Sequence, residues 1–525
     1  MDQPATFPTA STVLDAVALC DQTLPLHATR VRVPTYDRAS LTPAVVHLSV
    51  GGFHRAHQLV YFDDLAEQGC SDWGVVGVGL HTATMRDALA PQDHLFTVVE
   101  RDGEGDRARV IGALVDYHFA PDCPEAVLAR LTDDRTRLVT MTLTGTAYRI
   151  DPRTGELDPD EEMLADLADP HSPSSVFGYL VEALDRRRRA GQRPFTVLSC
   201  DNMEHNGRAA RAAVVGLARL RDEVLARWIA DSVSFPSSMV DRITPWTSTA
   251  DRDDIARTFG VDDRWPVITE AFSQWVVEDD FCNGRPPLET VGVGFVADVT
   301  RHQLMKTRLL NGSHSALGYL GHLAGLERID EVMDDEVLRE YVTRLMAEEI
   351  APLLPRPAGI DLAAYQRTLL ERFANPAIGD RLERLCRRGS SKVPDHLLPS
   401  LRAALEQGRP FELLALAVAG WFRYLRGVDL AGRPIEVEDE HAERLTQLAR
   451  AAGSDPRPLL AERSLFGDLA DEPHLVEALA SALQRLDRDG VRATLATALH
   501  ARPAARRPAA LAVDDDVPAA QEQLA

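Results

Sequence analysis

The chain has 525 residues, a hydrophobic content of 45% and a formal net charge of −23 at pH 7. This length is enough for two large domains or three small ones, each able to bury a core. The acidic balance argues against a nucleic acid partner, because binding phosphates requires a basic surface.

Six cysteines are scattered along the chain, and none forms a Cys-x-x-Cys pair. This pattern predicts neither a structural zinc site nor a disulfide framework. The N-terminus lacks a basic segment followed by an apolar one, and no run of about 18 apolar residues occurs. We therefore expect a cytoplasmic protein that binds no metal and no membrane.

The first 43 residues are polar and contain several prolines, so we interpret residues 1–43 as an N-terminal arm. The chain then changes to a short β-branched run at 45–50, which is typical of a buried parallel strand. A glycine turn, an amphipathic stretch through Leu65 and a second strand at 73–78 follow. This order of elements predicts a βαβ unit.

The glycine turn stands where a dinucleotide-binding turn of the type Gly-x-Gly-x-x-Gly would stand. Glycines at this place allow backbone N–H groups to approach a pyrophosphate at the start of a helix. Two of the three glycines are replaced, by Ser49 and His54. A plain tight turn between strand and helix is therefore an equally good interpretation. The predicted cofactor contacts in this turn are Val50, Gly51, Gly52, Phe53 and His54.

The second strand leads into Gly77-Val78-Gly79-Leu80, where an acidic residue would bind the adenosine ribose of NAD. No acidic residue occurs there before Asp87, so the sequence leaves both NAD and NADP open. We include Gly79 among the predicted cofactor contacts.

Further strands are expected at 95–99, 138–143 and 195–199, with helices between them. This alternation predicts an α/β fold with a doubly wound, Rossmann-type domain over 44–295.

After about residue 300, amphipathic segments alternate with Gly and Pro turns. We expect a mostly α-helical domain over 296–500. The last residues, 501–525, are rich in Ala, Pro and Asp and predict a disordered tail.

Lysine is rare in this chain: only Lys306 and Lys392 occur, against 55 arginines (57 Lys+Arg minus two). Arginine stays protonated in proteins, whereas a buried lysine can lose its proton near neutral pH and act as a base. A surface salt bridge is an equally good interpretation for Lys392.

The apolar periodicity of residues 301–320 predicts a buried helix that contains Lys306, Asn311 and His314. On an α-helical wheel, His314 lies about 80° and Asn311 about 140° from Lys306. We expect the three side chains to converge on one cavity as a base, an amide donor and an imidazole. The alternative is a polar stripe that faces solvent.

A second polar cluster, Cys200-Asp201-Asn202-Met203, follows the strand predicted at 195–199. Ligands of doubly wound sheets bind beyond the carboxyl ends of the strands, where Asn202 would lie. A helix N-cap is an equally good interpretation of Asn202.

These residues together resemble the polyol-specific long-chain dehydrogenase/reductase family, which covers the mannitol 2-dehydrogenase and fructuronate reductase type. The resemblance spans roughly residues 44–430 and rests on several long matches in the same order. The matching segments are 50–58, 199–203, 235–245, 274–279, 306–315 and 372–378.

The resemblance implies a Rossmann-type domain, a helical substrate-binding domain, no zinc, a monomer, and NAD as the cofactor, with NADP not excluded. It implies that Lys306 is the general acid/base, that Asn202 and Asn311 hold the reacting oxygen, and that His314 orients the substrate. Further contacts to hydroxyls or a carboxylate would come from Asp241, Arg384 and Lys392.

Two positions depart from the family pattern, because Gly145 and Gln303 stand where the family commonly has glutamate. We expect a zinc-independent oxidoreductase that interconverts a sugar alcohol and its ketose, similar to mannitol and fructose. One alternative is a reductase of a keto-hexuronate such as fructuronate or tagaturonate. The other is a non-catalytic homologue that binds a nucleotide or sugar, as Ser49, Gly145 and Gln303 would allow.

Overall fold

The computed structural model describes residues 16–103, 105–143, 145–151, 153–356 and 359–501. Residues 502–525 of the predicted tail, and 1–15 of the predicted arm, lie outside this part of the chain.

The chain separates into two compact units. The first runs to His314 and also takes in Glu327–Asp334 and Leu354–Leu385. The second consists of Ser315–Leu326, Asp335–Leu353 and the residues from Cys386 on. The domain boundary that we expect near residue 295 stays a prediction.

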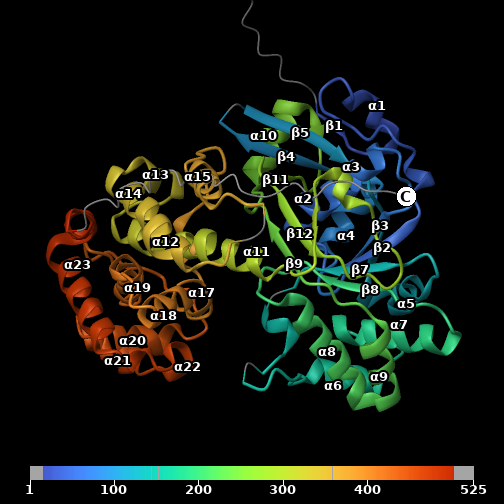
Figure 1. Ribbon diagram of the computed structural model, residues 1–525. Helices are drawn as coiled ribbons and strands as arrows, with labels where there is room; N and C mark the ends of the chain where they lie inside the picture. The colour runs from blue at the N-terminus through green and yellow to red at the C-terminus, as the bar shows by residue number, and fades with distance from the viewer. Residues whose placement is uncertain (1–15, 104, 144, 152, 357–358, 502–525) are drawn as a thin grey trace, which may run out of the picture. The chain divides into compact units, whose positions relative to one another are not determined.

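The first unit is built on a five-stranded parallel sheet, part of which is labelled in Figure 1. In spatial order its strands are β6 (Leu114–Phe119), β3 (Gly74–Gly79), β2 (Pro43–Leu48), β7 (Leu138–Met141) and β8 (Thr196–Ser199). The chain order along the sheet is thus third, second, first, fourth, fifth, which is a Rossmann order with its reversal between β2 and β7. The predicted doubly wound fold is confirmed.

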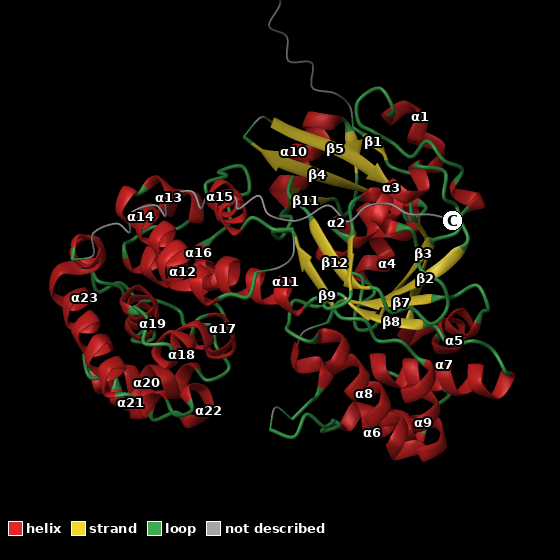
Figure 2. Cartoon of the chain, viewed as in Figure 1, coloured by secondary structure: helices red, strands yellow, loops and turns green. Residues whose placement is uncertain are grey.

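Both faces of this sheet are covered, which explains why its strands are so apolar. On one face, Val46, Val139 and Val197 belong to a core that includes residues of α7 (Val176–Ala190) and α8 (Asn206–Arg221), which Figure 2 shows next to each other. On the other face, Val45 and Leu138 pack in a core with α3 (Gln58–Glu67). Helix α7 starts at Ser175, whose hydroxyl accepts a hydrogen bond from the Gly178 N–H at 3.0 Å.

Two three-stranded sheets also belong to the first unit. The strand predicted at 95–99 exists as β4 (Phe96–Asp102), but it lies outside the parallel sheet, between β11 (Val267–Glu270) and β5 (Gly105–Ile111). The third sheet has the order β13 (Gly294–Val296), β12 (Gln274–Glu278) and β9 (Ser238–Asp241). In its antiparallel part, Asp241 at the end of β9 pairs with Gln274.

The first unit also contains a two-stranded sheet and further helices. Strands β1 (Val17–Ala18) and β10 (Val261–Asp262) form a parallel pair. The other helices are α1 (Leu24–His27), α2 (Gly52–Ala56), α4 (Thr84–Leu89), α5 (Pro124–Thr132), α6 (Glu161–Ala168), α9 (Glu223–Ser232), α10 (Thr249–Phe259), α11 (Thr300–Met305), α13 (Ile329–Asp334), α15 (Leu362–Phe373) and α16 (Leu382–Cys386).

The second unit is helical, as predicted. It contains most of α12 (Gly312–Leu323), with α14 (Glu336–Arg344), α17 (Gly389–His396), α18 (Leu398–Glu406), α19 (Glu412–Tyr424), α20 (Ala442–Ala452), α21 (Arg457–Leu460), α22 (Arg463–Phe466) and α23 (Pro473–His500). Helix α19 is its buried centre. The Glu349 carboxylate accepts hydrogen bonds from the N–H groups of Leu413 (3.0 Å) and Leu414 (2.8 Å), which satisfies donors that the first turn of a helix leaves free.

Among the described residues, no helix is both long and apolar enough to cross a membrane. All six cysteines are free thiols. The described part of the chain also contains no group of three or more His, Cys, Asp and Glu side chains that could hold a metal ion.

Candidate active site

A cavity of about 480 Å³ lies in the first unit, at the carboxyl ends of three strands of the parallel sheet. Ser49, Thr142 and Cys200 follow β2, β7 and β8 directly, and all three line the cavity. The cavity therefore lies where the strand order reverses, the place at which doubly wound sheets bind their ligands. Its size is within the range of pockets for small molecules and cofactors.

Lys306 lines this cavity and is 5% exposed. Its Nζ donates a hydrogen bond to Oδ1 of Asn202. Burial lowers the pKa of Lys306 to about 8; the Asp241 carboxylate opposes this shift and the Arg372 guanidinium adds to it. At pH 7, about a tenth of the amine is thus uncharged, whereas an ordinary lysine would be almost entirely protonated.

The helix around Lys306 is not a regular α-helix, because residues Lys306–Asn311 form a π-helical turn between α11 and α12. In a π-helix the hydrogen bonds join residues five apart, so Asn311 lies about one turn after Lys306. The 140° separation expected from the α-helical wheel is therefore wrong. Lys306, Asn311 and His314 all line the same cavity, as we expected.

His314 enters the cavity as a neutral imidazole. It is buried, and burial lowers its pKa to about 3. Its ring packs on that of Phe373 with the centroids 4.4 Å apart. Within the described residues, Nε2 of His314 is buried and has no hydrogen-bond partner.

Asn202 is positioned by the loop that follows β8. It is not the N-cap of α8, which begins at Asn206 and is preceded by His205. Instead, buried Asn206 fixes the loop: its Nδ2 donates to the carbonyl oxygens of Asp201 and Ser238, both at 2.9 Å. The N-cap interpretation of Asn202 is therefore wrong.

Asp201 is a titratable residue of this loop, which the sequence analysis included in the polar cluster but to which it assigned no role. Its carboxylate accepts hydrogen bonds from the Leu143 N–H, the Tyr148 hydroxyl and, at 3.1 Å, the Ser199 hydroxyl. Burial raises the pKa of Asp201 to about 7, and these hydrogen bonds oppose the shift. These contacts hold Asp201 in place, and Asp201 directly precedes Asn202 in the chain.

Gln303 ties the lysine helix to the same loop. Its Nε2 donates to the Ser238 carbonyl at 3.0 Å, and its Oε1 accepts from the His205 N–H at 3.1 Å. An ionised glutamate could accept the second hydrogen bond but could not donate the first. The departure from the family pattern at Gln303 therefore has a structural use.

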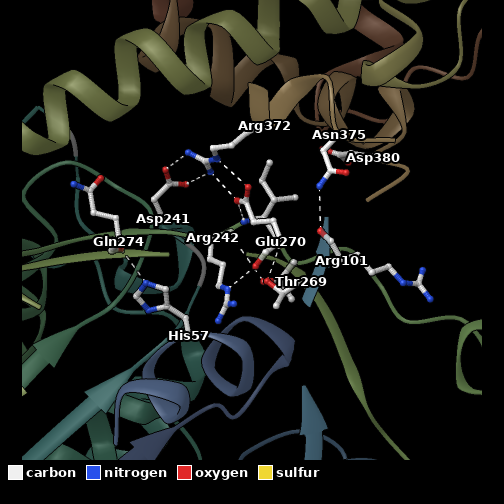
Figure 3. Close-up of polar contacts among 12 residues, drawn as sticks. His57, Arg101, Asp241, Arg242, Thr269, Glu270, Gln274, Arg372, Asn375 and Asp380 are labelled. Atoms are coloured by element: carbon white, nitrogen blue, oxygen red, sulfur yellow. Dashed lines mark hydrogen bonds and ion pairs between the residues drawn. The ribbon is translucent and has the colours of Figure 1, made fainter. Parts of the chain in front are cut away.

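Asp241 is held by an arginine that the sequence analysis did not single out. Arg372 donates from Nη1 to one oxygen of Asp241 at 2.7 Å and from Nη2 to the other at 3.1 Å. It also contacts Glu270 (Figure 3). Burial alone would raise the pKa of Asp241, but Arg372 holds that pKa below its ordinary value. The only sequence signal for Arg372 was its place in the matching segment 372–378.

The two other predicted substrate contacts lie in different units. Arg384 lines the cavity, and its guanidinium donates to both oxygens of Asp380, at 2.6 and 2.5 Å. Lys392 lies on α17 in the second unit, so its part in the site stays a prediction.

The predicted cofactor contacts divide into two groups. Gly51, Gly52 and Phe53 line the cavity, whereas Val50, His54 and Gly79 are not among the lining residues. Buried His54 stacks on His47 with the ring centroids 3.3 Å apart. A Cβ at Gly79 would collide with the Tyr117 hydroxyl, so packing requires that glycine.

The turn itself leaves room for a ligand. A Cβ at Gly51 would meet nothing within 4 Å, and one at Gly52 would meet only Thr244, at 3.9 Å. Both glycines thus present open backbone at the start of α2. This arrangement fits a pyrophosphate of a dinucleotide, which needs close approach to backbone N–H groups.

A doubly wound sheet with a ligand cavity at its reversal point is the architecture of Rossmann-type dinucleotide-binding proteins. Two family models match the chain: that of the mannitol dehydrogenase Rossmann domain over residues 43–290, and that of the mannitol dehydrogenase C-terminal domain over 298–487. The chain belongs to the mannitol dehydrogenase family, which confirms the resemblance found in the sequence.

Individual relatives agree with this assignment. The chain is 48% identical over 474 residues to a mannitol 2-dehydrogenase of Phaeosphaeria nodorum, covering 89% of this chain and 83% of the relative. It is 46% identical over 476 residues to that of Aspergillus fumigatus, covering 89% and 95%.

Two solved structures are similar over their whole length. Pseudomonas fluorescens mannitol 2-dehydrogenase, in a ternary complex with NAD and D-mannitol, has a TM-score of 0.85 and 42% identity and covers 92% of this chain and 100% of its own. A D-sorbitol dehydrogenase in substrate-free form has a TM-score of 0.84 and 37% identity, covering 91% and 100%.

Proposed function

We propose that this chain is an NAD-dependent, zinc-independent polyol dehydrogenase that interconverts a sugar alcohol and its ketose, with mannitol and fructose as the first candidates. The observation that carries the proposal is the buried amine of Lys306, which lies in the cavity beside the open glycine turn and contacts Asn202. The similar Pseudomonas enzyme, solved with NAD and D-mannitol, supports the choice of cofactor and substrate.

NAD, when bound at Gly51 and Gly52, supplies the hydride acceptor. In the oxidising direction, uncharged Lys306 removes the hydroxyl proton from the substrate. The carboxamide of Asn202 already accepts a hydrogen bond from Lys306 through Oδ1, so its Nδ2 is the group that can donate to the substrate oxygen. With Asn311 as a second donor, the site stabilises the negative charge that develops on this oxygen.

The charges around the cavity favour a neutral substrate over a uronate. Arg372 is paired with Asp241 and Glu270, and Arg384 is paired with Asp380. A substrate carboxylate would have to compete with these resident carboxylates for a cation. We therefore place a keto-hexuronate reductase second.

A substrate panel tests the proposal. Purified protein should oxidise mannitol or a related hexitol with NAD and reduce the matching ketose with NADH. Assays with NADP and NADPH determine whether the enzyme also accepts this second cofactor. Lys306→Ala should lower turnover by a factor of about 100 to 10,000 while NADH still binds. Turnover of uronates alone would contradict the polyol assignment, and cofactor binding without any turnover would point to a non-catalytic homologue.

The family resemblance also supports a monomer in the cytoplasm. Size-exclusion chromatography with light scattering should give a single species near the chain mass of 57.7 kDa. A stable dimer would overturn this part of the proposal.

A further inference from the structure

The matching segment 372–378 contains a residue whose contacts the reaction described above does not explain. Arg372, on α15, lies between two buried carboxylates, as Figure 3 shows. It donates to both oxygens of Asp241, and to Glu270 from Nε at 2.9 Å and from Nη2 at 2.8 Å. Its guanidinium also lies over the Phe272 ring, 4.0 Å from the centroid. Bidentate pairs of this kind fix geometry as well as charge.

The neighbouring residues of the segment keep Arg372 in place. Phe373 packs on His314. Asn375 donates from Nδ2 to the carbonyl of Arg101, at the far end of β4, at 3.1 Å. Arg372 therefore has a fixed position relative to the strand end that carries Asp241.

Asp241 lies near two cations. It binds Arg372 directly, and it lines the same cavity as Lys306, whose protonated form its charge stabilises. Arg372 acts on Lys306 in the opposite sense. Glu270 carries the second negative charge on Arg372 and itself lies outside the residues that line the cavity.

Most of the other titratable groups around this cluster do not change charge near neutral pH. Burial lowers the pKa of His57 and of His314 to about 3, and burial raises the pKa of Tyr365. Arg242 is paired with Glu100, and Arg384 is paired with Asp380. Asp201 lines the same cavity, and burial raises its pKa to about 7, so its charge changes near neutral pH in the wild type and in every variant alike. The variants described below alter only the charges of Glu270 and Arg372.

We propose that Arg372, held by Glu270, is a positioning residue that prevents Asp241 from becoming the full counter-ion of Lys306 and so keeps the amine available as a base. This inference rests on the proposed role of Lys306. Without Arg372, the negative charge of Asp241 would no longer be compensated by a bound guanidinium and would hold the proton on the Lys306 amine. Without Glu270, Arg372 would neutralise Asp241 more completely and the amine would release its proton more easily.

Two variants should shift the protonation midpoint of Lys306 in opposite directions. Glu270→Gln removes one negative charge, so we expect the protonation midpoint of Lys306 to fall by about half a pH unit or more. The double variant Glu270→Gln with Arg372→Gln removes one charge of each sign and leaves Asp241 to Lys306. In that variant we expect the midpoint to rise by about one unit. Removing both partners also avoids leaving a lone buried guanidinium or carboxylate pair.

The matched control is Glu278→Gln. Glu278 lies on β12 and accepts hydrogen bonds from the N–H groups of Ser237 (2.8 Å) and Val299 (3.3 Å), so it is a structural glutamate of the same unit. This substitution should leave the protonation midpoint of Lys306 unchanged.

The midpoint can be measured without catalysis, because the chain contains only two lysines. Limiting acetic anhydride across a pH series, followed by peptide mass spectrometry, reports the reactivity of Lys306 with Lys392 as internal reference. The acid limb of kcat/KM for alcohol oxidation provides a second reading.

The turnover assay tests the proposed function, and the labelling midpoint tests the role of Arg372. A wild-type protein that turns over no polyol would contradict the proposed function, while the labelling midpoint would still test Arg372. Midpoints that are equal in wild type and both folded variants, or that move in the same direction, would show that Arg372 only stabilises the fold. If Glu270→Gln does not fold, the double variant decides alone: an unmoved or lower midpoint overturns the inference.

Discussion

The Nζ of Lys306 donates a hydrogen bond to Oδ1 of Asn202, although the two residues are 104 positions apart in the chain. One residue comes from a π-helical turn and the other from the loop after β8. The contact fixes the direction of the amine and of the carboxamide at once. Because both groups line one cavity, the amine and an amide donor can act on the same substrate oxygen.

The two asparagines should be needed for the rate more than for folding. In Asn202→Ala and Asn311→Ala, each variant loses one amide donor to the developing charge, so we expect kcat to fall by a factor of about 100 to 1000. Steady-state kinetics with mannitol and fructose measures the effect. Asn283→Ala, which changes an asparagine that does not line the cavity, is the matched control. Equal kinetics in Asn202→Ala and the control would remove Asn202 from the reaction.

Substitutions at Gly51 and Gly79 should have different effects: the first should weaken cofactor binding, and the second should lower stability. A Cβ at Gly51 meets open space, so Gly51→Ala should fold normally but weaken NADH binding, by about tenfold or more, if a pyrophosphate lies there. Fluorescence titration with NADH measures this loss. Unchanged affinity would place the cofactor elsewhere.

Gly79→Ala should instead destabilise the fold by about 1–3 kcal/mol, because its methyl group collides with the Tyr117 hydroxyl. The second change Tyr117→Phe removes that hydroxyl and should restore most of the stability. Thermal unfolding of the single and double variants provides the comparison. A Gly79→Ala protein as stable as wild type would contradict the packing argument.

Gln303→Glu tests the tether between the lysine helix and the loop of Asn202. An ionised glutamate cannot donate to the Ser238 carbonyl, so we expect a loss of about 1–3 kcal/mol in stability. We also expect a lower kcat, because the loop that positions Asn202 becomes less constrained. If a carboxylate at this position instead raised kcat without loss of stability, proton exchange rather than tethering would be the function of the position.

Lys306 should cost stability at neutral pH. Its pKa is lowered from the ordinary value of 10.5 to about 8, so between these values the unfolded chain binds more protons and stability rises with pH. Below about pH 8 the cost is fully present and amounts to about 3 kcal/mol. Lys306→Met should therefore raise the unfolding temperature at pH 7, and the gain should shrink toward pH 10. A variant less stable than wild type at pH 7 would contradict a destabilising effect of the buried, charged amine.

The sequence predicts most of the parallel sheet, because β2, β3, β7 and β8 are short apolar runs. Strand β6 was missed, since as an edge strand it is only partly buried and includes Asp116 and His118. Strand β4 was recognised but lies in another sheet, because its partners β5 and β11 are set by tertiary pairing that local patterns do not record.

For the site, the residue types of Lys306, Asn311 and His314 were sufficient to predict a common cavity. The angle to Asn311 was wrong because the π-helical turn leaves no periodicity signal in six residues. Arg372 was missed because an arginine on an amphipathic helix is ordinarily a surface residue. Only its partners, Asp241 and Glu270, which are distant in sequence, reveal that it is buried.

The most direct test of the proposed role of Lys306 is the pH dependence of kcat/KM for mannitol oxidation with NAD. With the uncharged amine as the proposed base, the rate should rise with pH and level off above an ionisation near pH 8, and ketose reduction should fall through the same ionisation. Lys306→Ala should abolish this ionisation together with most of the rate. An unchanged ionisation near pH 8 in Lys306→Ala, or oxidation that is faster at pH 6 than at pH 9, would contradict the role of Lys306.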